Sequence, residues 1–364
     1  MSRRFDIAIV GAGMAGASLA AAIGEAASVV MLEAEANPGY HSTGRSAAFW
    51  SESYGGPLVQ PLTTASEAFL REKGFLKPRG GLHIADADGE GALETLHAEH
   101  GGKVRLEPLA RSELEAMVPG LRPGWSAGVY EPTCTDIDVA ALHAFYLAAA
   151  KRAGAVLITD AALRAARRED GIWRVDTKEG PVEAEVLVNA AGAWADAVAR
   201  LAGVRPLGIQ PYRRTVVQLR VDPPAPTDLP LVMDARETFY FKPEAGGRIW
   251  LSPQDETPCE AGDCAAEELD VAIAVDRLEK VVDWKVLRVE RAWAGLRSFA
   301  PDRLPVYGFD PRVAGFFWCA GQGGFGIQTA PAGADLAAAL LLGREPAGAA
   351  AGLDPASYGP KRFR

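Results

Sequence analysis

The sequence predicts an α/β protein with two domains. One is built on a parallel sheet from separated segments of the chain, and the other is an inserted α+β domain with an antiparallel-rich sheet. Three observations support this prediction. The chain has 364 residues, enough for about two domains. Short apolar runs typical of buried parallel strands occur near both ends and in the middle. Alternating runs typical of antiparallel strands fill the gaps.

The N-terminal residues predict a strand over 5–10, a helix over 14–24 and a second strand over 28–33, which together start a βαβ unit. The further predicted helices are residues 63–73, a helix capped by Asp136 and stopped by Gly154, residues 267–284, and residues 330–342. The further predicted strands are residues 81–85, 126–130, 155–158, 173–177, 184–189, 211–221, 238–252, 288–296 and 316–320. We therefore assign residues 1–75, 132–205 and 288–364 to the first domain, and 76–131 and 206–287 to the second.

Composition excludes several classes of protein. The net charge is −9 and no long basic run occurs, which argues against nucleic-acid binding. No uninterrupted apolar run reaches the roughly 18 residues of a membrane span. Asp6 and three glycines interrupt the apolar N-terminus, which argues against a signal peptide. The four scattered cysteines form neither a disulfide framework nor a zinc site, so we expect a metal-free cytoplasmic protein. The lack of an added arm or zipper favours a monomer.

A glycine-rich motif lies between the first predicted strand and helix. Gly11, Gly13 and Gly16 permit a tight turn, a close approach to a pyrophosphate and close helix–strand packing. Glu33 follows 22 residues after Gly11, where a carboxylate accepts hydrogen bonds from ribose hydroxyls. The motif predicts a Rossmann-like dinucleotide site but does not separate NAD from FAD. The neighbouring residues assigned to the same site are Met14, Ala15 and Ala34.

Four later segments extend this prediction: HSTGRSAA at 41–48, VLVNAAGAWAD at 186–196, WAGLRSF at 293–299 and CAGQGGFGIQT at 319–329. Together with the N-terminal motif, they resemble the FAD-dependent D-amino-acid oxidase superfamily, which has a glycine oxidase and sarcosine oxidase-like fold. The resemblance is closest to the D-arginine dehydrogenase-like branch. It implies an FAD-binding domain and a substrate domain whose sheet covers the flavin. It also implies hydride transfer from Cα to flavin N5, giving an imine that hydrolyses to a 2-oxo acid and ammonia.

The resemblance assigns further residues to FAD. They are Ser42, Thr43, Arg45, Ser46, Ala47, Ala48, Ala190, Gly192, Trp194, Gly295, Arg297, Gly323, Gly324, Phe325, Gly326, Ile327 and Gln328. Arg45 either neutralises the pyrophosphate or forms an ion pair within its loop, and residues 189–192 have a tight turn as their alternative reading. The glycines before the last helix aim its N-terminus at the flavin N1–C2=O locus, where it would stabilise negative charge. Residues 300–309 contain no cysteine, so we expect noncovalent FAD.

Two arginines are predicted to hold a substrate carboxylate. Arg297 and Arg214 match family positions that clamp this group, which arginine binds bidentately. Tyr54 and Tyr240 match nearby hydroxyls, and their alternative reading is ordinary half-buried aromatics. Arg213 and Arg214 point to opposite faces of a strand, so we expect Arg213 to face solvent. No general base appears at these positions, and catalysis is expected to rest on positioning and on flavin electrophilicity.

The substrate pocket departs from the D-arginine pattern. Gly81 stands where that branch has a glutamate that receives a cationic side chain, and Phe49 replaces a histidine. We therefore expect a neutral, apolar D-amino acid, because a cationic side chain would lose hydration without gaining a partner. Asp86 or Asp88 is the alternative acid. The remaining residues assigned to the pocket are Trp50, His83 and Gln328, with a structural histidine as the alternative for His83.

Other functions stay open from the sequence alone. A related enzyme acting on glycine, sarcosine, a cyclic imino acid or a 2-hydroxy acid would use the same arginine clamp. An NAD-dependent dehydrogenase would not need the C-terminal glycine cluster. A non-enzymatic dinucleotide-binding protein would not need the two arginines. The electron acceptor, O₂ or a quinone-like carrier, is not readable from the sequence.

Overall fold

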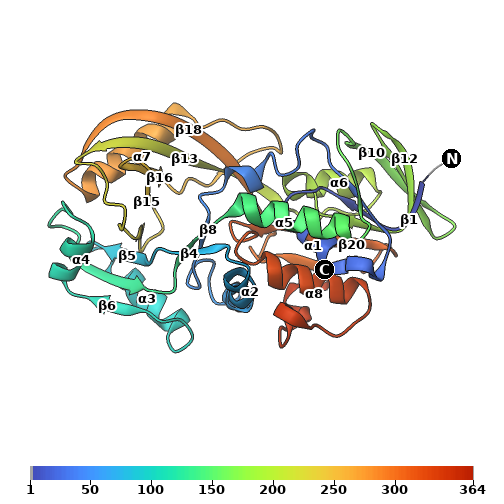
Figure 1. Ribbon diagram of the computed structural model, residues 1–364, viewed down its shortest axis with the longest axis horizontal. Coiled ribbons are helices and arrows are strands. Elements are labelled where there is room, and N and C mark those ends of the chain that lie inside the picture. Colours follow the sequence, from blue (N-terminus) through green and yellow to red (C-terminus); the bar gives the residue numbers. More distant parts are fainter. Residues whose placement is uncertain (1–2, 364) are drawn as a thin grey trace.

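The computed structural model describes residues 3–363, which form an elongated molecule with a large sheet towards each end (Figure 1). The N-terminal strand and the helices that cover it lie at one end, and the two longest strands arch over the other. The helices are α1 (Met14–Ile23), α2 (Gln60–Glu72), α3 (Glu90–His100), α4 (Arg111–Met117), α5 (Val139–Arg152), α6 (Ala195–Leu201), α7 (Glu268–Val281) and α8 (Ala330–Leu341).

The first sheet has parallel strands at its centre. Its strands in spatial order are β10 (Leu163–Glu169), β11 (Ile172–Thr177), β12 (Gly180–Asn189), β1 (Arg3–Val10), β2 (Val29–Leu32) and β9 (Val156–Ile158), and β20 (Phe316–Ala320) and β19 (Val306–Phe309) extend it from β12. β1 pairs in parallel with both β2 and β12, while β10, β11 and β19 are antiparallel to their neighbours. This arrangement agrees with the predicted Rossmann-like sheet.

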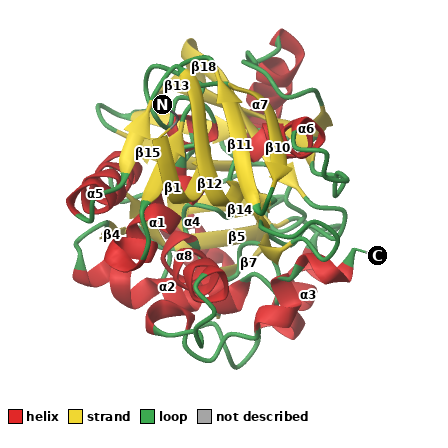
Figure 2. Cartoon of the chain, turned by 90° about the vertical axis from the view of Figure 1, so that its right-hand side faces the viewer, coloured by secondary structure: helices red, strands yellow, loops and turns green. Residues whose placement is uncertain are grey.

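Helices cover the centre of the first sheet, where β2 and β20 are buried along their whole length (Figure 2). α1 packs against α5 and α8 through small side chains. At Gly16 a Cβ atom would lie 2.0 Å from the Gly11 carbonyl oxygen, so only glycine permits this contact between helix and loop. The helix N-terminus is thereby held at the carboxyl edge of β1, where the motif residues lie.

The second sheet is mostly antiparallel. Its strands in spatial order are β21 (Gln322–Gly323), β18 (Lys285–Phe299), β13 (Gln210–Asp222), β16 (Arg248–Ser252), β15 (Tyr240–Glu244), β14 (Leu231–Asp234), β5 (Gly81–Ala85), β7 (Ala127–Glu131) and β6 (Glu107–Leu109), with β17 (Thr257–Pro258) paired to β13. β14 and β5 are its parallel pair. β13 and β18 pair from Gln210 opposite Phe299 to Asp222 opposite Lys285, and they carry residues from the far end of the sheet to the first sheet.

A short three-stranded sheet joins the two regions. It contains β3 (Phe49–Trp50), β8 (Thr135–Ile137) and β4 (Leu76–Pro78), in the order β3-β8-β4. Asp136 of β8 receives hydrogen bonds from Arg79 and Lys242. This partly buried carboxylate between two cations ties the small sheet to the second large one.

The structure corrects several local predictions. Asp138 rather than Asp136 caps α5, because the Asp138 carboxylate accepts from the Ala141 N–H at 2.9 Å while Asp136 belongs to β8. α2 begins at Gln60, three residues before the predicted start. Helices α3 and α4 were not predicted, because each buries few side chains: Leu93 and His100 in α3, and Leu114 in α4. Residue 288, the expected start of a domain segment, lies inside β18, which pairs within the second sheet, and the division into domains stays a prediction.

No helix within residues 3–363 is long and apolar enough to cross a membrane. The same residues contain no group of three or more histidine, cysteine or acidic side chains placed to hold a metal ion.

Candidate active site

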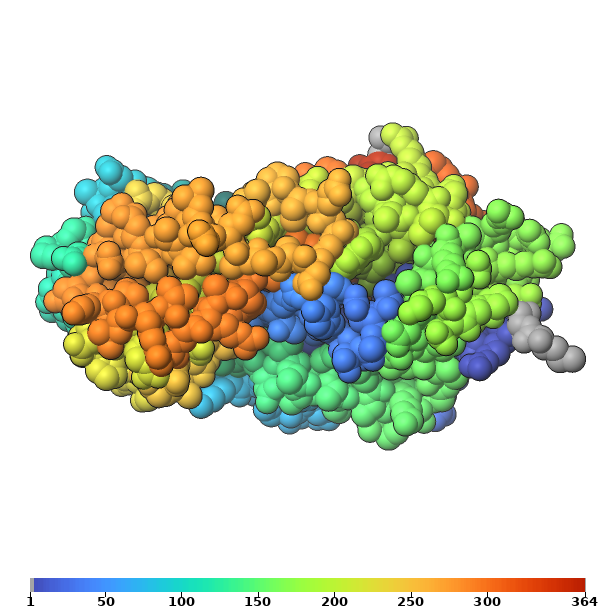
Figure 3. All heavy atoms as spheres, turned by 90° about the horizontal axis from the view of Figure 1, so that it is seen from above, coloured from blue at the N-terminus to red at the C-terminus, as the bar shows by residue number. Residues whose placement is uncertain are grey.

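A cavity of about 400 Å³ lies between the two large sheets. Its walls come from the β1–α1 loop, the end of β2, the 41–47 loop, the end of β12, strands β13, β15 and β18, and the turn before α8. In the space-filling view, N-terminal residues (blue) lie between the orange part of the second sheet and the green part of the first (Figure 3). We call the part lined by Gly11, Gly13, Met14, Ala15 and Glu33 the nucleotide end. We call the part lined by Arg214, Tyr240 and Arg297 the arginine end, and we include Tyr54, which does not line the cavity but bonds Arg297.

The nucleotide end is shaped by backbone geometry. Gly11 has a φ of +101°, and a Cβ atom there would lie 2.5 Å from the Ala190 carbonyl oxygen. Gly13 is the N-cap of α1, and the Met14 N–H donates to Thr43 Oγ1 at 3.0 Å. Gly13, Met14 and Ala15 of this helix start line the cavity, and a helix N-terminus suits an anionic pyrophosphate.

Glu33 is held in place at the end of β2. Its Oε2 accepts from the Ala12 N–H at 2.8 Å and its Oε1 accepts from the Glu35 N–H at 3.0 Å. Each carboxylate oxygen keeps a further lone pair for a ribose hydroxyl. The side chain is thus oriented by the backbone and presented to the cavity.

His143 supports this end and was missed by the sequence analysis. Its Nε2 lies 2.8 Å from the Ala12 carbonyl oxygen, across from the glycine-rich loop. Burial lowers the pKa of His143, so the neutral ring donates this bond at neutral pH. Gly39 lies against the same ring. Nothing in the sequence marked His143 beyond its place on a predicted helix.

Arg45 forms an ion pair, but with a distant segment and not within its own loop as the alternative had it. Its guanidinium lies 2.5 Å from Asp263 and donates to the carbonyl oxygens of Cys264 and Ala294. The loop can lie this close to β18 because Gly295 has no side chain: a Cβ there would be 3.1 Å from the Arg45 Cβ. Arg45 still lines the cavity, but its charge is already matched.

Most of the predicted FAD residues line the cavity. They are Gly11, Gly13, Met14, Ala15, Glu33, Ala34, Ser42, Thr43, Arg45, Ser46, Ala47, Ala190, Gly192, Trp194, Gly295, Arg297, Gly323, Gly324, Gly326 and Ile327.

Four do not line the cavity: Gly16, Ala48, Phe325 and Gln328. Gly16 acts through packing, and Ala48 turns its loop with a φ of +56°. Phe325 packs in a cluster with Val59. Gln328 is buried with both ends of its amide bonded to residues such as Ser51 and Thr63, so it holds the 51–63 segment and does not reach the substrate pocket.

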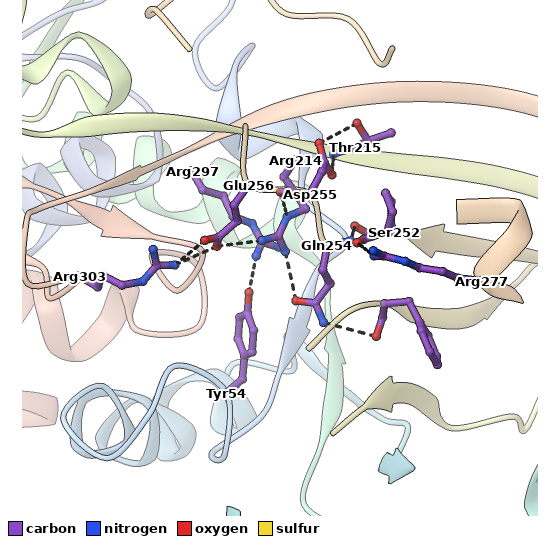
Figure 4. A network of polar contacts seen from close by, with 12 residues as sticks. Tyr54, Arg214, Thr215, Ser252, Gln254, Asp255, Glu256, Arg277, Arg297 and Arg303 are labelled. Carbon is purple, nitrogen blue, oxygen red and sulfur yellow. Dashed lines mark hydrogen bonds and ion pairs between the residues drawn. The ribbon is translucent and has the colours of Figure 1, made fainter. Parts of the chain in front are cut away.

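Four side chains from distant parts of the chain meet at the arginine end. Figure 4 shows three of them, Tyr54, Arg214 and Arg297. Arg214 of β13 and Arg297 of β18 lie on the same face of paired strands, since Arg214 is opposite Gly295 and Tyr212 is opposite Arg297. Arg297 donates to the Tyr54 hydroxyl. At Gly324 a Cβ would come within 2.8 Å of that hydroxyl and 3.0 Å of Arg297 Nη1, so this glycine keeps the end open.

The charges at this end are shaped by burial and by neighbours. Burial, followed by the charge of Arg297, lowers the pKa of Arg214. Burial also opposes the charge of Arg297, but the oxygens of Tyr54 and Tyr240 outweigh it and raise the pKa of Arg297. Burial raises the pKa of Tyr240, whose hydroxyl has no hydrogen-bond partner among the described residues. Tyr240 is therefore a free donor that lines the cavity next to two arginines.

Arg213 points away from the cavity, as the strand alternation predicts, but it does not face solvent. Its guanidinium pairs with Glu267 and Asp270 of the α7 region, and its side chain is 11% exposed. This corrects the predicted solvent position: α7 covers the outer face of β13 at this point.

The predicted pocket residues separate into two groups. Phe49 packs its ring at 5.1 Å from Tyr54 and 5.7 Å from Tyr240, so it supports the arginine end without lining the cavity. Trp50 points the other way into a hydrophobic core and donates to the Thr63 carbonyl, so it is not a pocket residue. The difference follows from strand alternation in β3.

Gly81 and His83 lie behind the Tyr54 wall. Gly81 lines neither cavity. It packs against Cys134, because a Cβ at Gly81 would lie 3.1 Å from the Cys134 Cβ. His83 lines a second, small cavity of about 30 Å³ on the far side of Tyr54. Its Nε2 lies 3.1 Å from Ser53 Oγ, which in turn donates to the buried carboxylate of Glu131. Burial opposes the charge of Glu131, but the nearby His83 and the hydrogen bonds from Ser53 and Ser51 lower its pKa. This places His83 in a bonded polar cluster.

Comparison with known proteins identifies the family. The sequence profile described as FAD dependent oxidoreductase matches residues 6–340. Glycine oxidase from Geobacillus kaustophilus is 27% identical over 373 residues, covering 95% of each chain. FAD-dependent oxidoreductase domain-containing protein 1 from Bos taurus is 30% identical over 44% of this chain, and this match covers 36% of the bovine protein.

Solved structures show the same fold. The crystal structure of L-proline dehydrogenase from P. horikoshii superposes with a TM-score of 0.86 and 22% identity, covering 100% of this chain and 98% of that one. Glycine oxidase from Geobacillus kaustophilus superposes with a TM-score of 0.85 and 24% identity over the whole of both chains. These comparisons confirm the predicted superfamily, the fold class and FAD as cofactor; they do not show the D-arginine dehydrogenase branch.

Proposed function

Because the chain belongs to the FAD dependent oxidoreductase family, we propose that it oxidises a D-amino acid with a neutral, apolar side chain to the imine, which hydrolyses to a 2-oxo acid and ammonia. The observation that carries this proposal is the arginine end. Arg297 and the free Tyr240 hydroxyl meet there in a cavity whose other end fits a dinucleotide. An α-amino acid has one carboxylate, which a buried arginine and a tyrosine hydroxyl bind and orient.

Different residues of the cavity bind the cofactor and the substrate. The β1–α1 loop and Glu33 fit the pyrophosphate and ribose of FAD, which accepts the hydride from the substrate Cα when bound. Arg297 holds the substrate carboxylate, and Tyr54 fixes the Arg297 guanidinium. Tyr240 donates its hydroxyl hydrogen to the same carboxylate. Holding one end of the substrate in this way limits the orientations that its Cα–H bond can take.

We propose that no side chain acts as a general base. Among the described residues that line the large cavity, the acidic side chains are Glu33 and Glu35, and both belong to the nucleotide end. The substrate amine is therefore expected to bind deprotonated, and the rate should follow its pKa. If mutation of one side chain abolished the limiting kinetic pKa while flavin and substrate binding survived, that side chain would be the base and this idea would fail.

The preference for a neutral side chain is supported by what surrounds the arginine end. Phe49 supplies an aromatic wall between Tyr54 and Tyr240. Asp86, the alternative acid, is paired with Arg236 at 2.8 Å. A cationic side chain beside Phe49 would lose hydration, and Asp86, which lines neither cavity and is already paired, would not compensate for that loss.

Anaerobic mixing with a panel of substrates tests the proposal through bleaching of the flavin. The panel contains D-leucine, D-phenylalanine, D-methionine, D-arginine, glycine, sarcosine, L-proline, L-leucine and lactate. We expect the first three to bleach the flavin fastest. A clear preference for D-arginine would overturn the neutral side chain, and a preference for the L-amino acids would overturn the stereochemistry. An inert flavin would favour the non-enzymatic alternative. Admission of O₂ to the bleached sample then tells an oxidase from a dehydrogenase.

We also propose that FAD is bound noncovalently. None of the four cysteines lines the large cavity, and Cys134 and Cys319 are buried elsewhere. Flavin should separate from the polypeptide on acid or heat denaturation. Flavin that stayed with the denatured chain would contradict this.

A further inference from the structure

The segment that follows β16 surrounds Arg214 with acceptors. Arg214 Nε donates to the Asp255 carbonyl at 2.8 Å, one terminal nitrogen donates to Gln254 Oε1 at 3.3 Å, and the other donates to Glu256 Oε1 at 3.0 Å (Figure 4). Both terminal nitrogens of the guanidinium therefore have protein partners. From the sequence, Arg214 and Arg297 were both predicted to bind the substrate carboxylate. In the structure Arg214 already has protein partners, so Arg297 is the arginine that remains available to a substrate.

The segment is anchored and does not hang loosely in the site. The Asp255 carboxylate accepts from the Thr215 N–H at 2.6 Å and from Thr215 Oγ1 at 3.0 Å. This carboxylate is 8% exposed. Two buried hydrogen bonds tie Asp255 to β13, and this fixes the position of the next residue, Glu256. A ligand that competed for Arg214 would therefore have to displace Glu256.

Glu256 is held from two sides. Arg303 donates to both of its carboxylate oxygens, at 2.8 and 3.1 Å, and Arg303 itself lies over the Phe299 ring at 3.9 Å. Figure 4 shows Arg303 and Arg214 reaching the Glu256 carboxylate from opposite sides. Arg303 faces outward with half of its side chain exposed, while Arg214 is buried. Glu256 therefore brings one negative charge next to the buried Arg214, at an end that also holds Arg297.

We infer that Glu256 is a specificity residue: it acts as a resident carboxylate that occupies Arg214 and reserves the site for substrates with a single carboxylate. A monocarboxylate needs Arg297 and Tyr240 alone. A dicarboxylate would need Arg214 for its second carboxylate, but Arg214 already donates to Glu256. The negative charge of Glu256 would also repel this second carboxylate at short range. For turnover, this inference rests on the proposed function; for ligand binding, it does not.

The test compares Glu256→Gln with the wild-type holoprotein. Acetate and malonate are titrated while the flavin absorbance is followed, and kcat/KM is measured for D-alanine and D-aspartate. We expect wild type to favour the monocarboxylate, and Glu256→Gln to shift both ratios about tenfold towards the dicarboxylate. The expected shift is moderate because Glu256 is partly exposed and solvent screens its charge.

Two further variants make the result specific. Glu260→Gln removes the same charge from an exposed residue four positions along the loop, which forms no ion pair within residues 3–363, and should leave both ratios unchanged. Arg303→Met removes the outer partner of Glu256, so its charge acts more strongly on the site. This variant should shift the ratios the opposite way, further towards the monocarboxylate.

Each outcome decides the inference. Unchanged ratios in a Glu256→Gln protein that retains FAD would overturn it, and so would an equal shift in Glu260→Gln. If Glu256→Gln loses FAD, the surface variant Arg303→Met decides: a shift of both ratios towards the monocarboxylate supports the inference, and a shift the other way or none overturns it. If no amino acid bleaches the flavin, the proposed function fails, while the acetate and malonate titration still tests Glu256.

Discussion

The nucleotide end of the cavity is made of backbone from one short stretch of chain, whereas the arginine end is made of side chains from four distant stretches. Residues 11–16 and Glu33 lie within one strand–helix–strand unit, so local geometry alone brings them together. Tyr54, Arg214, Tyr240 and Arg297 meet because β13 and β18 pair along their length and the 51–54 turn is held beneath them. The two ends should therefore fail separately when mutated, one losing cofactor and the other losing substrate.

The largest effect is expected at the arginine end. Arg297→Met should lower kcat/KM by about a thousandfold, because loss of a buried charged partner costs about 3–5 kcal/mol. The flavin content should stay near that of wild type. Steady-state kinetics and the flavin-to-protein ratio measure the two quantities. The control is Arg291→Met, an exposed arginine on the same strand, which should retain activity. Loss of FAD in Arg297→Met would show that the two ends are coupled.

The matching change at the nucleotide end is Gly11→Ala. A side chain there meets the Ala190 carbonyl at 2.5 Å with a φ of +101°, so we expect the FAD dissociation constant to rise at least about a hundredfold, from about 3 kcal/mol of strain and clash. The control is Gly24→Ala, where φ is +59° but no atom lies within 4 Å of the added Cβ, and which should bind FAD nearly normally. Equal FAD loss in both variants would mean that chain stability, and not the cavity wall, is responsible.

A smaller effect is expected for the free hydroxyl. Tyr240→Phe removes a donor to the substrate carboxylate and should raise KM about tenfold, which corresponds to about 1.4 kcal/mol, with FAD binding unchanged. Tyr212, on the neighbouring strand β13, supplies the control as Tyr212→Phe, because it packs with Phe299 and does not line the cavity. An unchanged KM in Tyr240→Phe would remove Tyr240 from the carboxylate site.

The smallest effect concerns the support of the nucleotide end by His143. Burial lowers its pKa in the folded protein, so the unfolded chain takes up more protons as the pH falls through about 6.5, and the stability due to this group is lost in that range. The free energy of unfolding of wild type should be about 1 kcal/mol larger than that of His143→Gln at pH 8, and the difference should be smaller at pH 5. Urea unfolding at each pH measures the difference. A difference that did not change with pH would contradict the neutral, buried state of His143.

Prediction from sequence was most reliable where the signal is local. The strand–glycine–helix unit was predicted nearly at its observed bounds, because apolar runs and glycines act through adjacent residues. The Asp138 cap was misplaced by two residues, since Asp136 is equally suited to capping and only its partners Arg79 and Lys242 place it in a strand. Trp50 and Phe49 were both assigned to the pocket, and strand alternation sends one of them into the core.

The sequence by itself determined the family, the cofactor class and the residues of the glycine-rich loop, because these depend on short motifs whose spacing carries the chemistry. The tertiary structure decided how the charges are shared. Arg45 is paired with Asp263, Arg213 with the α7 region, and Arg214 with Glu256. Charge pairing depends on which side chains the fold brings within a few ångströms, and these partners lie from 42 to 218 positions apart in the chain. A local sequence pattern therefore could not predict these ion pairs.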